Sequence, residues 1–79
     1  MITNKDLLKQ YQVFSNNVKN KRKEKNLTQE ELAEYSDLSI SYVKQIESSN
    51  DFKNLTLTTM LKLSKALDTT INILFYNMD

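Results

Sequence analysis

The stretch that decides the fold spans residues 27–47 and has the sequence LTQEELAEYSDLSISYVKQIE. Thr28 and Glu31 have the S/T-x-x-E spacing of a capping box, in which two side chains satisfy unpaired N–H groups at the start of a helix. Asp37 is a residue type that favours turns, and Ser39 is a preferred N-cap for a second helix. The pattern therefore predicts two short helices separated by a turn.

A longer helix is predicted before this stretch, over residues 4–25. Thr3 and Asp6 have the spacing of a capping pair at its start. Apolar residues recur every three or four positions, as on the buried face of a helix: Leu7, Leu8, Tyr11, Phe14 and Val18. The pattern fits one continuous helix or two helices that are broken near residues 15–17.

Two further helices are predicted after a polar loop. Thr56 caps the first, at about residues 57–67, and Thr70 caps a short last helix at residues 71–76. The buried face of the fourth helix is expected to hold these positions: Leu57, Met60 or Leu61, Ser64 and Leu67. The chain is therefore predicted to be all-α, with five helices in a single domain over residues 1–79.

The composition excludes several classes of chemistry, because the chain contains no Gly, Pro, Cys, His or Trp. Without Cys and His it has no disulfide, no thiol nucleophile and none of the usual nitrogen and sulfur ligands of zinc. Without Gly it lacks the loops that bind nucleotide phosphates. We therefore expect no metal, no cofactor, no small-molecule ligand and no enzymatic activity.

The net charge is +1, from 11 Lys and Arg against 10 Asp and Glu, which is low for a nucleic-acid-binding protein. The cations are unevenly placed, however, because residues 19–25 carry five cations and one acid, a local charge of +4. Salt screens charges beyond roughly 8–10 Å, so this local excess can still meet phosphates. The alternative is a solvated helix end whose cations favour the negative end of the dipole.

The sequence favours a cytoplasmic protein with no membrane partner. No apolar run approaches the roughly 18 residues of a membrane span, and the N-terminal MITNKDLLKQYQ lacks the apolar core of a signal peptide. The chain has 10 Lys and 9 Asn but three residues in total from Ala, Arg, Gly and Pro. Because those four are encoded mainly by GC-rich codons, we infer an AT-rich bacterial, plasmid or phage source.

Residues 27–47 resemble the helix-turn-helix of the phage repressor/Cro family, the Xre-type transcriptional regulators, and residues 56–75 resemble its fourth and fifth helices. The resemblance implies a lambda-repressor-like DNA-binding domain of five helices, here with an N-terminally extended first helix. The helix-turn-helix would lie at about residues 28–48. The helices at about residues 56–76 would supply core and dimer contacts.

The sequence departs from this family at two turns, where the family usually has Gly. Asn26 follows the first helix, and Asp37 lies in the turn of the helix-turn-helix. Asn and Asp are the residues other than Gly that best tolerate positive φ. We therefore predict left-handed backbone conformations at both positions.

The resemblance implies DNA contacts centred on the recognition helix at residues 39–48. Gln29 would bind a phosphate at the N-terminus of the preceding helix, where backbone N–H groups and the dipole attract an anion. The outward residues of the recognition helix would read bases in the major groove: Ile40, Ser41, Lys44 and Gln45. Contact with a thymine methyl would explain an exposed Ile40, although a lone surface hydrophobe needs no explanation.

Secondary DNA contacts are implied at the margins of this helix. Ser39 would cap the helix and contact a phosphate. Two roles are open for Tyr42: packing in the core, or contact with a phosphate through its hydroxyl. Lys53 and Asn54, before the fourth helix, are secondary candidates for phosphate contact. The alternative for Gln29 is an ordinary solvated residue at the start of its helix.

Arg22 and Glu47 are a second pair of candidate functional residues, with opposite charges. Arg22 lies on the same predicted helix face as Val18, so it should point inward, and Glu47 ends the recognition helix. The resemblance pairs these positions in a partly buried salt bridge, a role that suits Arg because its guanidinium binds a carboxylate through two hydrogen bonds. The alternative is two independent surface charges.

The last predicted helix provides the argument for a homodimer. It is short and apolar on nearly all sides, so a small domain cannot bury all of it. Three of its residues are therefore expected at a dimer interface: Ile73, Phe75 and Tyr76. Alternatively, the N-terminal extension covers this patch through other apolar residues: Leu7, Leu8 and Tyr11.

The sequence therefore predicts a sequence-specific transcriptional regulator that binds double-stranded DNA as a homodimer at a palindromic operator. A restriction-modification controller and a small phage or plasmid repressor both fit this prediction. The alternative is a protein-interaction module such as an antitoxin, in which DNA binding is secondary.

Overall fold

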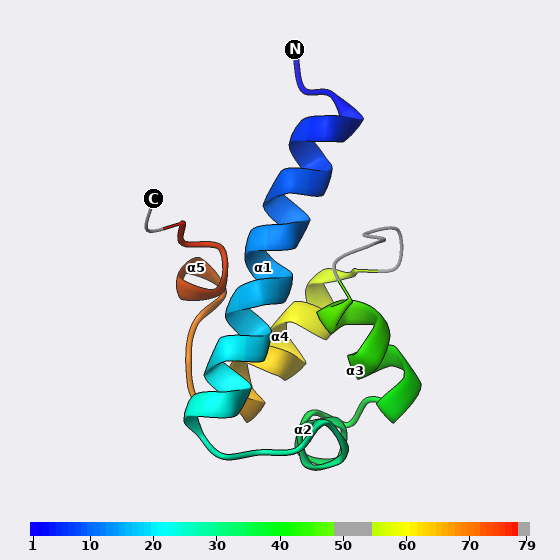
Figure 1. Cartoon of the computed structure of the whole chain (residues 1–79), viewed down its shortest axis with the longest axis vertical. Helices are drawn as coiled ribbons and strands as arrows, with labels where there is room; N and C mark the ends of the chain where they lie inside the picture. The colour runs from blue at the N-terminus through cyan, green and yellow to red at the C-terminus, as the bar shows by residue number, and fades with distance from the viewer. Residues whose placement is uncertain (49–54, 78–79) are drawn as a thin grey trace.

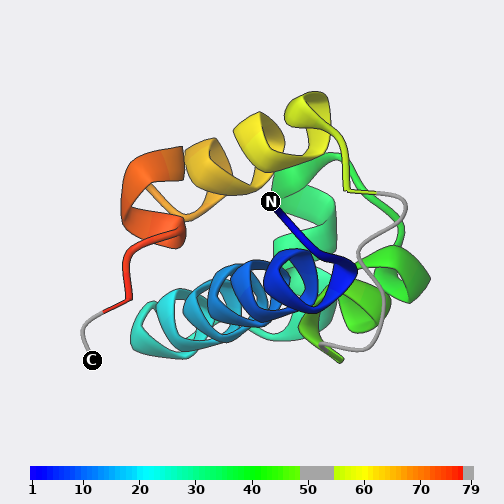
Figure 2. The same cartoon turned by 90° about the horizontal axis from the view of Figure 1, so that it is seen from above.

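The computed structural model describes residues 1–48 and 55–77, and within these ranges it contains five α-helices and no strand. The helices have the following bounds: α1 Asn4–Glu24, α2 Gln29–Ser36, α3 Ile40–Glu47, α4 Leu57–Ala66 and α5 Ile71–Leu74. The N-terminal turns of α1 project beyond the body that the other helices form around its C-terminal half (Figure 1). Seen from above, α4 and α5 lie on one side of the molecule and α1 on the other (Figure 2). The predicted all-α class is confirmed.

The first helix is continuous over 21 residues, so the break considered near residues 15–17 does not occur. Its predicted capping pair is present: the Asp6 N–H donates to Thr3 Oγ1, and the Thr3 N–H donates to Asp6 Oδ2. Hydrogen bonds from the backbone N–H and the hydroxyl of Thr3 lower the pKa of Asp6. The capping box of Thr28 and Glu31 at the start of α2 is likewise confirmed.

Three helices end at a residue in the left-handed conformation. Asn26 and Asp37, which the sequence predicts, have φ of 58° and 57°, and Asp68 after α4 has φ of 53°. In each case the next residue donates its N–H to a carbonyl five positions earlier, as from Leu38 to Ala33. This is the bond of a Schellman motif, which satisfies a carbonyl that the helix leaves unpaired. The position usually taken by Gly is therefore filled here by Asn or Asp.

Replacing Asn26 with Ala should lower the free energy of unfolding by about 1–2 kcal/mol. The Cβ atom of any residue other than Gly disfavours positive φ, and Ala lacks the polar side chain that lets Asn tolerate this conformation. Asn26→Gly should retain the stability of the unmodified protein, and Asn20→Ala, within α1, should change it by less than about 0.5 kcal/mol. Urea denaturation measures all three. Equal stability of the Asn26→Ala variant and the unmodified protein would contradict a constraint at this turn.

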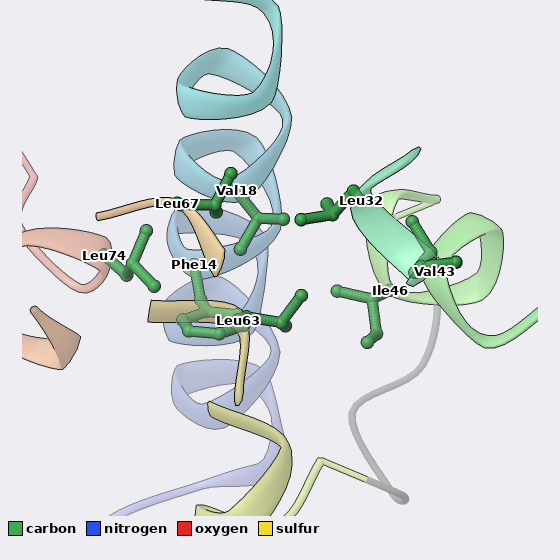
Figure 3. Close-up of a cluster of buried hydrophobic side chains, with 9 residues drawn as sticks. Phe14, Val18, Leu32, Val43, Ile46, Leu63, Leu67 and Leu74 are labelled. Atoms are coloured by element: carbon green, nitrogen blue, oxygen red, sulfur yellow. The ribbon is translucent and has the colours of Figure 1, made fainter. Parts of the chain in front are cut away.

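The core gathers one or two side chains from every helix around the middle of α1 (Figure 3). Its largest members are each less than 2% exposed: Phe14, Val18, Leu32, Val43, Ile46, Leu63, Leu67 and Leu74. Burying one such side chain contributes about 1.5–3 kcal/mol. Phe75 packs its ring against Phe14, with the ring centroids 4.8 Å apart. This shared core fixes α2 and α3 relative to α1.

The predicted buried face of α4 is correct at Ser64 and Leu67, and of the alternatives Met60 and Leu61 it is Met60 that packs against the core. The prediction is wrong at Leu57. Leu57 is 61% exposed and Leu61 is 46% exposed, whereas Thr59 is buried. The Thr59 N–H and hydroxyl oxygen are hydrogen-bonded to Thr56 Oγ1, so this polar residue can turn inward. The inward face therefore follows the row that runs from Thr59 to Leu67 in steps of four residues, and the two leucines lie outside it.

The last helix is shorter than predicted, because α5 ends at Leu74 and the following residues to 77 continue without helix. Its cap is as expected: the Ile73 N–H donates to Thr70 Oγ1. Within the described residues, no helix combines the length and apolar character that crossing a bilayer requires.

Candidate nucleic-acid interface

Helices α2 and α3 are joined by residues 37–39 and form the predicted helix-turn-helix. Ser39 caps α3 by accepting a hydrogen bond from the Tyr42 N–H at 3.1 Å. Val43 and Ile46 are buried against the core, which fixes the rotation of α3 about its axis. The opposite face carries exposed side chains: Ser41, Lys44 and Gln45. These three residues lie outward, where the periodicity of the sequence places them.

Ile40 is not exposed in the way the sequence suggests. It is half-buried and packs against the core, so its apolar surface is partly covered by its own domain. It also lines a surface depression of about 310 Å³ together with Gln29, Lys44 and two neighbours, Thr28 and Glu30. The first turn of α3 therefore lies near the first turn of α2, and the packing of Ile40 against the core accounts for its partial burial.

The ion pair between Arg22 and Glu47 joins α1 to the end of α3. Arg22 Nε donates to Glu47 Oε2 at 2.8 Å, and Nη2 donates to Oε1 at 3.0 Å. The two side chains are 11% and 2% exposed, so the pair is largely removed from water. Arg22 Nη1 also donates to the carbonyl of Leu27 at 2.8 Å. The guanidinium of Arg22 thus binds both the end of α3 and the segment between α1 and α2, and it fixes their positions relative to each other.

Gln29 belongs to the same network. Its Nε2 donates to Glu47 Oε1 at 3.1 Å, and its side chain is half-buried. No sequence pattern indicates this bond, because Gln29 and Glu47 lie on different helices. The amide group has a second hydrogen, which this bond leaves for another acceptor. The N-terminus of α2 is therefore tied to the C-terminus of α3 by a side chain that the family resemblance assigns to phosphate.

Tyr42 is held against the protein rather than extended into solvent. It is half-buried, and its hydroxyl lies 3.4 Å from Thr59 Oγ1 on α4. This geometry favours the core-packing alternative for Tyr42. Lys53 and Asn54 lie outside the described residues.

Two polar residues of α1 that were not predicted as site residues hold the end of α3. Ser15 Oγ and the Tyr11 hydroxyl donate to the carbonyl of Ile46, at 2.6 and 3.1 Å. Carbonyls in the last turn of a helix have no N–H partner within it, so these side chains satisfy one of them. Their spacing of four residues on the same face as the buried Phe14 and Val18 is the signal that could have revealed them.

The residues expected at a dimer interface differ in their surroundings. Ile73 is 48% exposed and Tyr76 is 63% exposed. Phe75 is half-buried and packs its ring on Phe14, so part of this ring is covered by the domain itself. The N-terminal extension does not cover the other two, since Tyr11 is bonded to the end of α3 instead.

The comparison with known proteins agrees with this arrangement. A family model described as helix-turn-helix matches residues 18–74. The control protein C.SmaI of Serratia marcescens is 38% identical over 60 residues, which are 76% of this chain and 69% of that protein. The crystal structure of the restriction-modification controller protein C.AhdI from Aeromonas hydrophila superposes with a TM-score of 0.75 and 37% identity, over 82% of this chain and 96% of that one. The predicted family is confirmed: the chain belongs to the helix-turn-helix family of DNA-binding transcriptional regulators.

Proposed function

We propose that this regulator binds a palindromic operator as a homodimer and inserts α3 of each protomer into the major groove. The observation that carries the proposal is the exposed polar face of α3, which lies beside the N-terminus of α2 and is fixed by the buried ion pair behind it. The major groove admits one α-helix, and an N-terminus next to it suits a phosphate. Because the two relatives are controllers, the genes regulated would be those of a restriction-modification system.

The side chains on this face have different chemical capacities. The amide of Gln45 can bind adenine through two hydrogen bonds, and Lys44 can reach guanine or a phosphate. Ser41 can donate or accept. Ile40 would offer the part of its side chain that remains exposed to a thymine methyl, and Ser39 and Tyr42 would lie at the margin, near the phosphates. Lys53 and Asn54 stay secondary phosphate contacts in this proposal.

Gln29 would contribute to a phosphate contact through the second hydrogen of its amide and through the first N–H groups of α2. The bond to Glu47 leaves that hydrogen available and restricts the orientation of the amide. The same restriction lowers the entropy that the side chain loses on binding.

Self-association would use the exposed side chains beside α5. Ile73 and Tyr76 offer apolar surface, and Phe75 supports them from behind through its contact with Phe14. A twofold dimer through this region would present two recognition helices to half-sites about one DNA turn, roughly 34 Å, apart.

Selection of bound sequences from random duplex DNA, followed by a salt titration on the winning site, tests the proposal. We expect one palindrome, and an affinity that falls steeply with salt because phosphate contacts release counterions. A scrambled duplex of the same length is the control. Weak binding of equal strength to both duplexes would contradict the proposal and favour a protein-interaction module.

Replacing Gln45 with Ala should weaken binding to the selected operator by about 1–3 kcal/mol, roughly 5- to 150-fold, for each base that the amide no longer binds. The effect should be smaller for operators altered at the base that Gln45 reads. Gln12→Ala, on the exposed surface of α1, provides the matched control. Fluorescence anisotropy at fixed salt measures the affinities. An unchanged affinity of the Gln45→Ala variant would remove Gln45 from the interface.

A further inference from the structure

The segment that carries Ile73 and Tyr76 has little secondary structure of its own. Helix α5 comprises four residues, and one turn of helix is not stable in isolation. Its position must therefore come from contacts with the rest of the domain. Two of these contacts are apolar: Leu74 is buried, and Phe75 packs on Phe14.

The third contact is polar and comes from Asn17, in the middle of α1. Asn17 Nδ2 lies 2.8 Å from the carbonyl oxygen of Leu74 and 2.9 Å from that of Tyr76. A carboxamide nitrogen has two hydrogens, so these two short bonds use both of them. A longer contact of 3.5 Å reaches the carbonyl of Ile73, which already accepts the N–H of Tyr76.

This geometry fixes the direction of the chain beyond α5. The carbonyl of Leu74 belongs to the planar peptide group between residues 74 and 75, and the carbonyl of Tyr76 belongs to the one between residues 76 and 77. Asn17 therefore restrains the backbone both before and after Tyr76. Tyr76 and Asn17 also line the same surface depression of about 460 Å³, next to Asn16. Together with the two apolar contacts, the amide of Asn17 thus helps to determine which side chains of the segment face outward.

We propose that Asn17 is a positioning residue for self-association, because it holds residues 73–76 in the conformation that presents Ile73 and Tyr76 to a second copy of the chain. This inference rests on the homodimer proposed above. Without the two hydrogen bonds, a smaller fraction of protomers has the segment in this conformation. Because both protomers of a dimer must have the segment in this conformation, the apparent dimer dissociation constant rises in inverse proportion to the square of that fraction.

Two substitutions of Asn17 test the inference. Asn17→Asp keeps the shape of the side chain but replaces both donor hydrogens with an acceptor that faces two carbonyl oxygens. Asn17→Ala removes the bonds without this repulsion and favours the helical state of α1, so folding should be retained. Gln10→Glu is the matched control, because it makes the same change from amide to carboxylate at an exposed position of α1 that does not line the depression beside Tyr76.

Sedimentation equilibrium gives the dimer dissociation constant, and hydrogen exchange reports local order. We expect the constant to rise at least about tenfold in both Asn17 variants and less than about threefold in Gln10→Glu. Amide exchange should accelerate at residues 74–76 and stay slow at Leu32 and Val43.

The outcomes separate this inference from the proposed function. If the unmodified protein dimerises and both Asn17 variants match it, the inference is wrong and the homodimer stands. If the unmodified protein is monomeric at all concentrations, the homodimer and the inference fail together. Faster exchange throughout the core of the variants would show a general structural role and would overturn the positioning role.

Discussion

Replacing Arg22 with Ala is expected to lower the free energy of unfolding by about 3–5 kcal/mol, as when one partner of a buried ion pair is removed. The Glu47 side chain is 2% exposed, so its carboxylate depends on protein donors rather than on bulk water for the hydrogen bonds that stabilise its charge. The amide of Gln29 would remain as a donor, but it carries no charge. Since small domains are stable by about 5–15 kcal/mol, urea denaturation should place this variant close to the limit of folding.

A neighbouring pair provides the control. Lys21 and Glu24 form an ion pair at 3.5 Å on the surface of α1, and such exposed pairs contribute about 0–1 kcal/mol. Lys21→Ala should therefore be nearly neutral. If Arg22→Ala were equally mild, the pair with Glu47 would contribute no more than a surface contact.

A double substitution separates the effect of the charge from the effect of packing. Replacing Arg22 with Met and Glu47 with Leu removes both charges while keeping much of the apolar volume. This double variant should recover a large part of the stability that Arg22→Ala loses, because no buried charge remains unpaired. A double variant as unstable as Arg22→Ala would instead assign the loss of stability to the bond that Arg22 makes with the carbonyl of Leu27.

Helix starts, and the turns that end α1 and α2, were predictable because their signals are local. Every N-cap that the sequence indicates accepts a hydrogen bond from the backbone N–H three residues later: Thr3, Thr28, Ser39, Thr56 and Thr70. A cap needs only its own hydroxyl and the adjacent backbone. The left-handed turns at Asn26 and Asp37 were predictable for the same reason, because the residue type sets the tolerance for positive φ.

The orientation of helix faces was less predictable, because it depends on what packs against each helix. Thr59 is buried since Thr56 satisfies its polar atoms, and Leu57 is exposed although it is the more apolar residue. Ile40 is half-buried because it packs against the core that several helices share. Hydropathy and spacing contain no information about such neighbours.

The sequence predicted which residues of α3 are exposed, but it did not predict the hydrogen bonds that join the site to distant residues. The periodicity of α3 placed Ser41, Lys44 and Gln45 on the exposed face, and their contacts with DNA stay predictions. The bond from Gln29 to Glu47 and the bonds from Asn17 to the carbonyls of Leu74 and Tyr76 join residues 18 to 59 positions apart. Polar side chains can choose among many such distant partners, so a single sequence cannot identify the pair.

Replacing Ile73 with Asp is expected to separate the proposed dimer and to weaken binding to the full operator by about 10²–10⁴-fold. The side chain is 48% exposed in one protomer, so the added charge costs the folded monomer little. In a twofold interface the two carboxylates would be brought together and removed from water, which opposes association. Each monomer then binds one half-site without the gain that comes from linking two sites.

Leu61→Asp is the matched control, because Leu61 is 46% exposed but lies on α4. Sedimentation should find the Ile73→Asp variant monomeric and the Leu61→Asp variant dimeric at the same concentration. On a duplex that carries one half-site, both variants and the unmodified protein should bind with similar affinity, because α3 is unchanged.

If Leu61→Asp were instead the variant that dissociates, the interface would lie on α4, where Leu57 and Leu61 offer a second exposed apolar surface. Similar loss of half-site and full-site affinity in Ile73→Asp would show that the substitution disturbs α3 itself, since linkage between half-sites cannot affect a duplex that carries only one.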